Sequence, residues 1–225
     1  MPDLLTNLNE LSGGLFIIAA FGIVAARQMR GCMIFFIFQS FFLAASAFLL
    51  GIITSSDHLM IVGGINILTK VIFLPWLLSR LVPRKISTKR EIVQVINIPT
   101  SLIIALLLTI TAYFLTVPWL KAAPGADALH INVPIGLAGL LLGAYTLSVR
   151  REAVPQLLGL LSMENGAFFA GVAIAPNLPL MLELALAFDI LIITFIAGIL
   201  TRTVQERIGT TAVGTLSTLR EEPRK

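Results

Sequence analysis

Charged residues are scarce in this sequence of 225 residues: Asp, Glu, Lys and Arg make up 12% of it, whereas 57% is hydrophobic. Soluble domains carry about 25% charged residues, so the composition excludes an ordinary water-soluble domain. Only helices and closed barrels satisfy their backbone polar groups inside lipid. The long apolar runs therefore predict an all-α membrane protein.

Residues that hold metals or perform covalent chemistry are equally scarce. The chain has one cysteine, Cys32, and two histidines, His58 and His130, which lie far apart in polar segments. One cysteine excludes an intrachain disulfide, and the sequence has no glycine-rich phosphate-binding motif and no nucleophile elbow. We expect no metal, no haem, no iron–sulfur cluster or other cofactor, and no catalytic residue.

Seven apolar segments are long enough to cross a bilayer core of about 30 Å as helices. We divide the chain into an N-terminal three-helix membrane unit with a cytoplasmic loop (1–98), a connecting helix with an outer loop (99–131), and a C-terminal three-helix unit with a cytoplasmic tail (132–225). The predicted spans are 11–27, 32–53, 59–82, 99–120, 132–149, 155–176 and 179–201.

The basic residues predict how the chain is oriented. Fourteen of the 16 fall in alternate loops or the C-terminal tail, whereas Lys121 lies on the opposite side and Lys70 inside a span. Basic residues gather on the cytoplasmic side of membrane proteins. The N-terminus is therefore predicted outside and the C-terminus in the cytoplasm. Topology thus explains the net charge of +4 without a nucleic-acid partner.

Three ionisable residues fall near the middle of their predicted spans: Lys70, Glu164 and Asp189. Each is about 15 Å from a helix end at 1.5 Å per residue. An Asp or Lys at that depth costs about 2.5–3.5 kcal/mol to insert. We expect the three side chains to face a protein interior or a wet cavity, and to meet one another.

Polar and small residues near these charges form the expected supporting group. Gly63, Asn66 and Lys70 share one face of their helix, with Thr69 beside them and Pro75 further along. Since proline cannot donate to the carbonyl four residues earlier, we expect a kink next to Lys70. The supporting polar residues are Asn66, Thr69, Asn165 and Gln39.

Two interpretations of the buried charges stay open. In the first, Lys70 and a carboxylate form a static bridge that locks helices together. In the second, Glu164 and Asp189 exchange protons and Lys70 tunes them, because burial favours a neutral acid and a nearby cation favours a charged one. Two acids for one lysine favour the relay slightly, since a bridge needs a single acid.

The segment "LLGLLSMENGAFF" and its flanking helices resemble the K-type subunit of respiratory complex I and the C-type subunit of Mrp antiporters. The resemblance covers about residues 135–220 and implies one membrane-embedded acid in each of the last two helices. Asp189 matches the second acid. The first acid departs from the family pattern. Leu161 occupies the position at which the family has this acid, and Glu164 follows three residues later, about one turn deeper on a similar helix face.

The whole chain resembles the component E family of hydrogenase-4, found in formate-hydrogenlyase-type assemblies. "LTKVIFLP" (68–75), "MENG" (163–166) and the late Asp189 carry this resemblance. It implies a subunit without a redox cofactor in an energy-converting, complex-I-like hydrogenase that translocates protons. The implied partners are antiporter-like and complex-I-like membrane subunits, together with the lipid bilayer. The implied location is the cytoplasmic (inner) membrane of a bacterium or archaeon.

Other functions remain as alternatives to a proton-translocating subunit. The chain could be a purely structural scaffold in the same complex, or a subunit of an Mrp-like cation/proton antiporter. A stand-alone transporter is disfavoured because no polar constellation of substrate size is visible. A retinal-type pump needs its lysine in the last helix, whereas here that helix carries Asp189.

Overall fold

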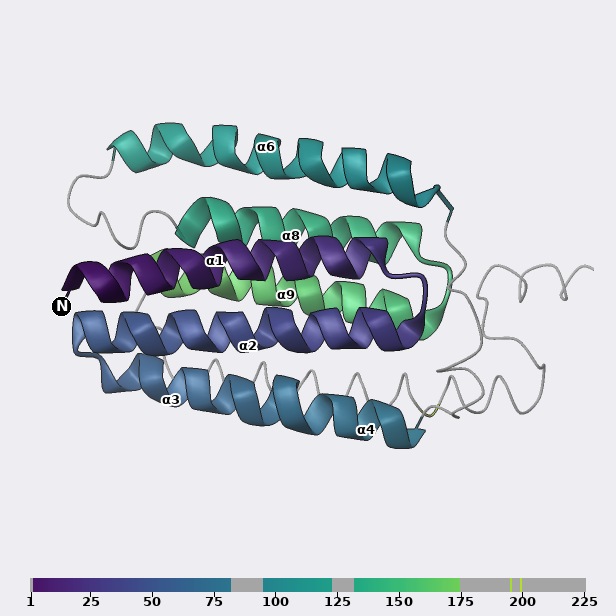
Figure 1. Cartoon of the computed structure of the whole chain (residues 1–225), viewed down its shortest axis with the longest axis horizontal. Coiled ribbons are helices and arrows are strands. Elements are labelled where there is room, and N and C mark those ends of the chain that lie inside the picture. Colours follow the sequence, from purple (N-terminus) through teal and green to yellow (C-terminus); the bar gives the residue numbers. More distant parts are fainter. Residues whose placement is uncertain (1, 82–94, 123–131, 175–194, 196–198, 200–225) are drawn as a thin grey trace, which may run out of the picture.

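The computed structural model describes residues 2–81, 95–122, 132–174, 195 and 199 (Figure 1). The part of the chain within these ranges is all-helical, as the sequence predicts. The helices are α1 (Pro2–Ala25), α2 (Met29–Thr54), α3 (Asp57–Asn66), the π-helix η1 (Ile67–Phe73), α4 (Leu74–Leu81), α6 (Ile98–Ala122), α8 (Asn132–Val149) and α9 (Ala153–Ile174).

Four helices form the centre of the molecule: α1, α2, α8 and α9, which pack side by side (Figure 1). Helix α6 lies outside them against α8 and α1, and the continuous segment α3–η1–α4 lies against α2. Short links connect neighbours. The link between α2 and α3 turns at Ser55, a non-glycine residue with a positive φ of 53°, whose neighbour Ser56 donates its N–H to the carbonyl of Gly51 (2.9 Å).

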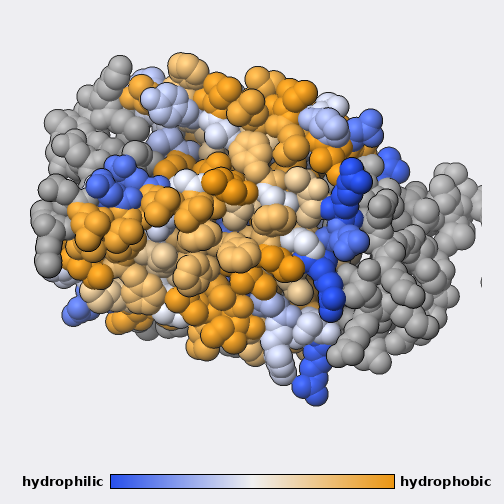
Figure 2. All heavy atoms as spheres, viewed as in Figure 1, coloured by the Kyte–Doolittle hydropathy of each residue, from blue (hydrophilic) through white to orange (hydrophobic). Residues whose placement is uncertain are grey.

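Five helices are long and apolar enough to cross a membrane: Leu4–Ala25, Met29–Thr54, Asp57–Arg80, Ile98–Pro118 and Asn132–Val149. A broad apolar belt covers the visible face, with hydrophilic residues toward both ends (Figure 2). The sixth predicted span, 155–176, falls on α9, a helix of 22 residues. The seventh, 179–201, lies outside the described ranges except for residues 195 and 199, so seven crossings and the orientation stay predictions.

The first helix begins earlier than the sequence indicated. The predicted start was residue 11, but α1 begins at Pro2, where a proline fits because the first helical residue needs no N–H partner. Asn9 is fully buried instead of lying in an outer segment. Its side chain finds polar partners on α2 and α8, so the helix can continue through a polar residue without exposing it to lipid.

Glycines bring α8 and α9 unusually close. A Cβ atom at Gly143 would collide with the backbone nitrogen of Met163, and one at Gly166 would collide with that of Leu140. Small residues at such positions let membrane helices approach closely and gain dispersion contacts. This contact fixes the level at which the polar part of α9 sits in the molecule.

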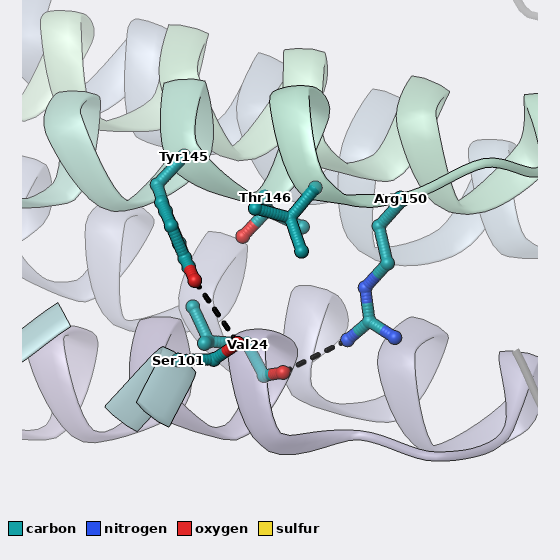
Figure 3. A pocket seen from close by; sticks show the side chains of 6 residues that line it. Val24, Ser101, Tyr145, Thr146 and Arg150 are labelled. Atoms are coloured by element: carbon teal, nitrogen blue, oxygen red, sulfur yellow. Dashed lines mark hydrogen bonds between the residues drawn. The ribbon is translucent and has the colours of Figure 1, made fainter. Parts of the chain in front are cut away.

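Arg150, which the sequence marked as a loop charge, is buried between helix ends. It is 2% exposed, and its Nη2 donates to the carbonyl oxygens of Ile23 (2.8 Å) and Val24 (2.9 Å) at the end of α1. Nearby, the Tyr145 hydroxyl donates to Ser101 Oγ (3.0 Å), which ties α8 to α6 (Figure 3). Since the last carbonyls of a helix have no partner within it, Arg150 caps α1.

Burial lowers the pKa of the Arg150 guanidinium, while nearby Cys32 and Glu152 act in the opposite direction. An arginine remains cationic even so. A cation at a helix C-terminus also interacts favourably with the helix dipole. Arg150 therefore joins the ends of α1 and α8 both by hydrogen bonds and by charge.

We predict that Arg150→Met lowers the stability of the protein by about 1–3 kcal/mol, because two buried carbonyls of α1 lose their donor. Arg151→Met is the matched control, since the neighbouring Arg151 is exposed. Thermal unfolding of the full chain in detergent measures both. Equal melting temperatures for the two variants would contradict a capping role for Arg150.

Candidate functional site

Lys70 lies in the middle of the π-helix η1 rather than in a regular α-helix. Helices of this type are rare and are frequently found at functional sites. The Thr69 hydroxyl donates to the carbonyl of Ile65 (2.8 Å), and Pro75 two residues after η1 has no N–H to donate. The sequence predicted a kink next to Lys70; the structure has a π-helix there, which the sequence did not indicate, and the kink itself stays a prediction.

A hydrogen-bonded chain crosses three elements at the centre of the molecule. Lys70 Nζ donates to Glu164 Oε1 (2.8 Å) and to Asn165 Oδ1 (2.8 Å). Asn165 Nδ2 in turn donates to Ser40 Oγ on α2 (2.8 Å). The Lys70 cluster, as we call these four residues, therefore joins η1, α9 and α2 through polar side chains alone.

Apolar layers enclose the Lys70 cluster on both sides along the helices. About one turn before Ser40 in α2 and before Glu164 in α9 lie Phe36 and Leu161, which belong to a large buried group with Leu74 and Leu78. About one turn after Ser40 and Asn165 lie Leu43 and Phe169, which form a second buried group with Phe16. Within the described residues, polar side chains of the cluster thus have apolar neighbours above and below.

Exposure differs sharply between the two charged partners. The Lys70 side chain is 5% exposed and that of Glu164 is 25% exposed. In such surroundings opposite charges attract strongly, but each has lost much of its hydration. Lys70 depends on Glu164 and Asn165 for its hydrogen bonds, whereas part of the Glu164 side chain reaches the surface of the described part of the chain.

The supporting residues predicted from sequence take different positions. Asn165 belongs to the Lys70 cluster, whereas Thr69 bonds to its own helix backbone. Asn66 is 6% exposed and its Oδ1 has no partner in the described part of the chain. Gln39 is fully buried, and neither its Nε2 nor its Oε1 has a partner there. An unpaired buried polar group costs about 1–3 kcal/mol.

Asp189, the third predicted relay residue, lies outside the described ranges. Its relation to Lys70 and Glu164 therefore stays a prediction. Among the residues that the structure does describe, no group of three or more His, Cys, Asp or Glu side chains could hold a metal ion.

A second buried polar group was missed in the sequence. Asn9 Nδ2 donates to Asn132 Oδ1 (3.0 Å), Ser46 Oγ donates to Asn9 Oδ1 (2.6 Å), and Asn132 Nδ2 donates to Ser46 Oγ (3.1 Å). This Asn9 triad joins α1, α2 and α8 toward the N-terminal end of α1. Asn9 lies before the first predicted span and Asn132 is the first residue of another, so the sequence gave no reason to expect either side chain in the core. The available signal was Ser46, seven residues after Gln39 and hence on the same helix face.

We predict that the Lys70–Glu164 pair behaves as a coupled unit. Lys70→Met or Glu164→Leu alone should destabilise the protein, because each leaves the other charge without its partner. The loss should be near the low end of about 3–5 kcal/mol, because Glu164 is partly exposed. The double variant should lose less than the sum of the two. Thermal unfolding of the four proteins gives this cycle, and additive losses would show that the pair contributes no coupling.

The chain has relatives that match it over almost its entire length. The uncharacterized protein Rv0085 of Mycobacterium tuberculosis (strain ATCC 25618 / H37Rv) is 31% identical over 216 residues, which cover 95% of this chain and 96% of that protein. Hydrogenase-4 component E of Escherichia coli (strain K12) is 23% identical over 216 residues, covering 95% of this chain and 97% of that protein. Component E of Shigella flexneri gives the same values.

No family model matches the chain, and no solved structure does. Because the match to Rv0085 covers 95% of this chain, it includes the helices that carry Lys70 and Glu164. Hydrogenase-4 component E is a more distant relative of similar length. The chain belongs to the same protein family as Rv0085 of Mycobacterium tuberculosis.

Proposed function

We propose that this protein is an integral membrane subunit of an energy-converting, complex-I-like hydrogenase of the hydrogenase-4 or formate-hydrogenlyase type. Its part is to take protons across the membrane in step with redox chemistry performed elsewhere in the complex. The distant similarity to hydrogenase-4 component E and the five apolar helices support this proposal.

The single observation that carries a role in proton transfer is the Lys70–Glu164 pair. A lysine held in an apolar region and a partly exposed acid lie 2.8 Å apart. A charge so far from water is costly, and residues of this kind usually mark ion or proton paths in membrane proteins. Glu164 is the group that can gain or lose a proton, because its carboxylate reaches the boundary of the packed core.

The geometry supports a simple cycle of charge states. A proton that arrives at Glu164 converts its carboxylate to the neutral acid and removes the ion pair. Lys70 keeps its hydrogen bond to Asn165 Oδ1 (2.8 Å), so the ammonium is not left without a partner. When the proton leaves, the ion pair forms again. Asp189, which we propose as the second carboxylate of the relay, would receive the proton or supply it.

The hydrogenase complex would provide the partners for such a cycle. We propose that these are antiporter-like and complex-I-like membrane subunits in the cytoplasmic membrane of a bacterium or archaeon. No redox cofactor is assigned to this chain, and its residues would transfer protons only. A redox change in the neighbouring subunits must then alter the surroundings of Glu164 for protons to move in one direction.

A structural scaffold is the second candidate, and one observation favours it. The Lys70 ammonium already has two good acceptors, Glu164 Oε1 and Asn165 Oδ1, as a static helix bridge requires. A subunit of an Mrp-like antiporter would use the same residues with a different set of partners. Purification of the protein from native membranes, followed by identification of the proteins that accompany it, separates the hydrogenase from the antiporter.

We predict that Glu164→Gln stops or strongly reduces proton uptake into inverted membrane vesicles that carry the intact complex. The amide retains the size of the side chain and can still accept from Lys70, but it cannot carry a proton. Asp189→Asn, made separately, should have the same effect. Redox turnover and the amount of assembled complex are measured in the same vesicles.

Glu10→Gln is the control, because Glu10 is an exposed acid near the N-terminus. It should leave proton uptake unchanged. If the Glu164→Gln complex assembles and still takes up protons at the normal rate, Glu164 is structural and the relay is wrong. Loss of assembly in that variant, with a normal control, would favour the scaffold.

A further inference from the structure

Exposed charged side chains of opposite sign lie toward opposite ends of the molecule. The exposed arginines that the structure describes are Arg27, Arg30, Arg80 and Arg151. They belong to the link between α1 and α2, the first turn of α2, the last turn of α4 and the link between α8 and α9, which share one end of the helix bundle (Figure 1). The exposed acids that it describes, Glu10 and Asp57, lie in the first half of α1 and at the start of α3, toward the other end.

The arginine-bearing end has no negative charge of its own to balance these four side chains. None of the four forms an ion pair with an Asp or Glu side chain of the described residues. Like charges on one surface repel one another, and they raise the local concentration of anions. This end of the molecule therefore fits a partner that carries negative charge.

Trp76 and Arg80 form the most specific feature of this end. They lie four residues apart in α4, and Arg80 Cζ is 5.5 Å from the centroid of the Trp76 ring. A guanidinium at this distance is attracted to the face of the ring. Tryptophan is enriched where headgroups meet the hydrocarbon core of a bilayer, and Trp76 is 51% exposed. Such a pair is typical of the level at which a membrane helix leaves the hydrocarbon region.

An exposed apolar line leads along η1 and α4 to this pair. Leu68, Ile72 and Trp76 are 62%, 57% and 51% exposed. They are four residues apart, a spacing that keeps side chains on one side of a helix, and Arg80 follows after four more. This segment belongs to a helix long and apolar enough to cross a membrane, Asp57–Arg80. A lipid chain can therefore lie along the line while its headgroup reaches the guanidinium.

We propose that the Trp76–Arg80 pair binds an anionic phospholipid. Arg80 donates to the phosphate oxygens, and one acyl chain packs along Ile72 and Leu68. A guanidinium presents five N–H donors in a planar fork that matches phosphate, and no described residue accepts from those of Arg80. A headgroup with net negative charge is preferred to a zwitterionic one, because the other exposed arginines of this end attract it as well.

A lipid fits this surface better than the acidic face of a soluble protein does. A soluble partner could approach Arg80, but it would not reach the apolar line from Leu68 to Trp76. Lipid bound here would also hold the end of the segment that carries Lys70, ten residues or about 15 Å before Arg80 along the helix. Lipid binding does not depend on the proton relay that we propose.

The fluorescence of Trp76 provides the test, because bromine on a lipid chain quenches a tryptophan that the lipid contacts. The chain has two tryptophans, so Trp119→Phe leaves Trp76 as the reporter. The full chain with this change is placed in vesicles of phosphatidylglycerol and phosphatidylcholine, in which one of the two lipids carries brominated chains. Exchanging the brominated lipid gives the relative binding of the two lipids at Trp76.

We expect phosphatidylglycerol to bind at Trp76 about fivefold more strongly than phosphatidylcholine, the equivalent of about 1 kcal/mol for one arginine near anionic lipid. Equal binding of the two lipids would overturn the proposal, and this comparison needs no change at Arg80. In Arg80→Gln, made in the same Trp119→Phe background, the preference for phosphatidylglycerol should disappear.

Arg151→Gln is the matched control. It removes one exposed positive charge from the same end of the molecule, but from the link between α8 and α9. The lipid preference at Trp76 should be retained in this variant. An equal loss of preference in Arg151→Gln and Arg80→Gln would show that the total charge of this end attracts the lipid, and a specific site at Trp76 and Arg80 would then be wrong.

A density map of the membrane complex identifies the occupant directly. Headgroup density beside Arg80, continued by chain density along Ile72, is the expected result. An acidic side chain of another subunit on Arg80, in place of a lipid, would overturn the site.

Discussion

The ammonium group of Lys70 is the constraint on which the arrangement at the centre of the molecule depends. A cation without a partner is strongly unfavourable in an apolar interior, and a lysine at the middle of a membrane-crossing helix has no short path to water. The structure meets this demand by placing Glu164 and Asn165 within 2.8 Å of Nζ. Because both acceptors are on α9, the position of α9 along its axis and its rotation about that axis determine the environment of the lysine.

Two features of the fold hold those partners at the correct level. Glycines allow α9 to approach α8 closely, with Gly166 directly after Asn165 against the backbone of Leu140. The widened helix η1 presents Lys70 from the opposite side. Such helices are rare and are frequently found at functional sites, and here one carries the lysine of the ion pair. Backbone irregularity and close helix packing thus serve the same ion pair.

Much of this arrangement could be predicted because charges in apolar spans are conspicuous. Lys70, Glu164 and Asn165 were identified from depth and helix face alone, and the all-helical fold followed from the length of the apolar runs. The bounds of single helices were less certain: α1 starts nine residues before the predicted start, because Asn9 finds partners across the bundle. Hydropathy measures each residue alone and cannot detect such partners.

The residues that sequence reasoning missed share this cause. Arg150 was counted as a loop charge because arginine usually lies in water at the cytoplasmic end of a helix. Its true surroundings depend on where the end of α1 comes to lie. Similarly, the sequence indicated that Gln39 was polar and in a span, but not that its amide would lack a protein partner. Pairing is a property of several elements together, so it becomes visible only when they are assembled.

The static bridge and the proton relay make different demands on the surroundings of the ion pair. A bridge is most effective when both partners are fully enclosed and every polar atom nearby is paired. Here the lysine is enclosed, but its acid is 25% exposed, and two amides close in sequence to the cluster, Gln39 and Asn66, have unpaired atoms in the described part of the chain. An arrangement that served rigidity alone would gain stability from apolar residues at both amide positions. Two incompletely paired amides near a partly exposed acid therefore fit the relay that we propose better than a static bridge, because a relay needs an acid that protons can reach.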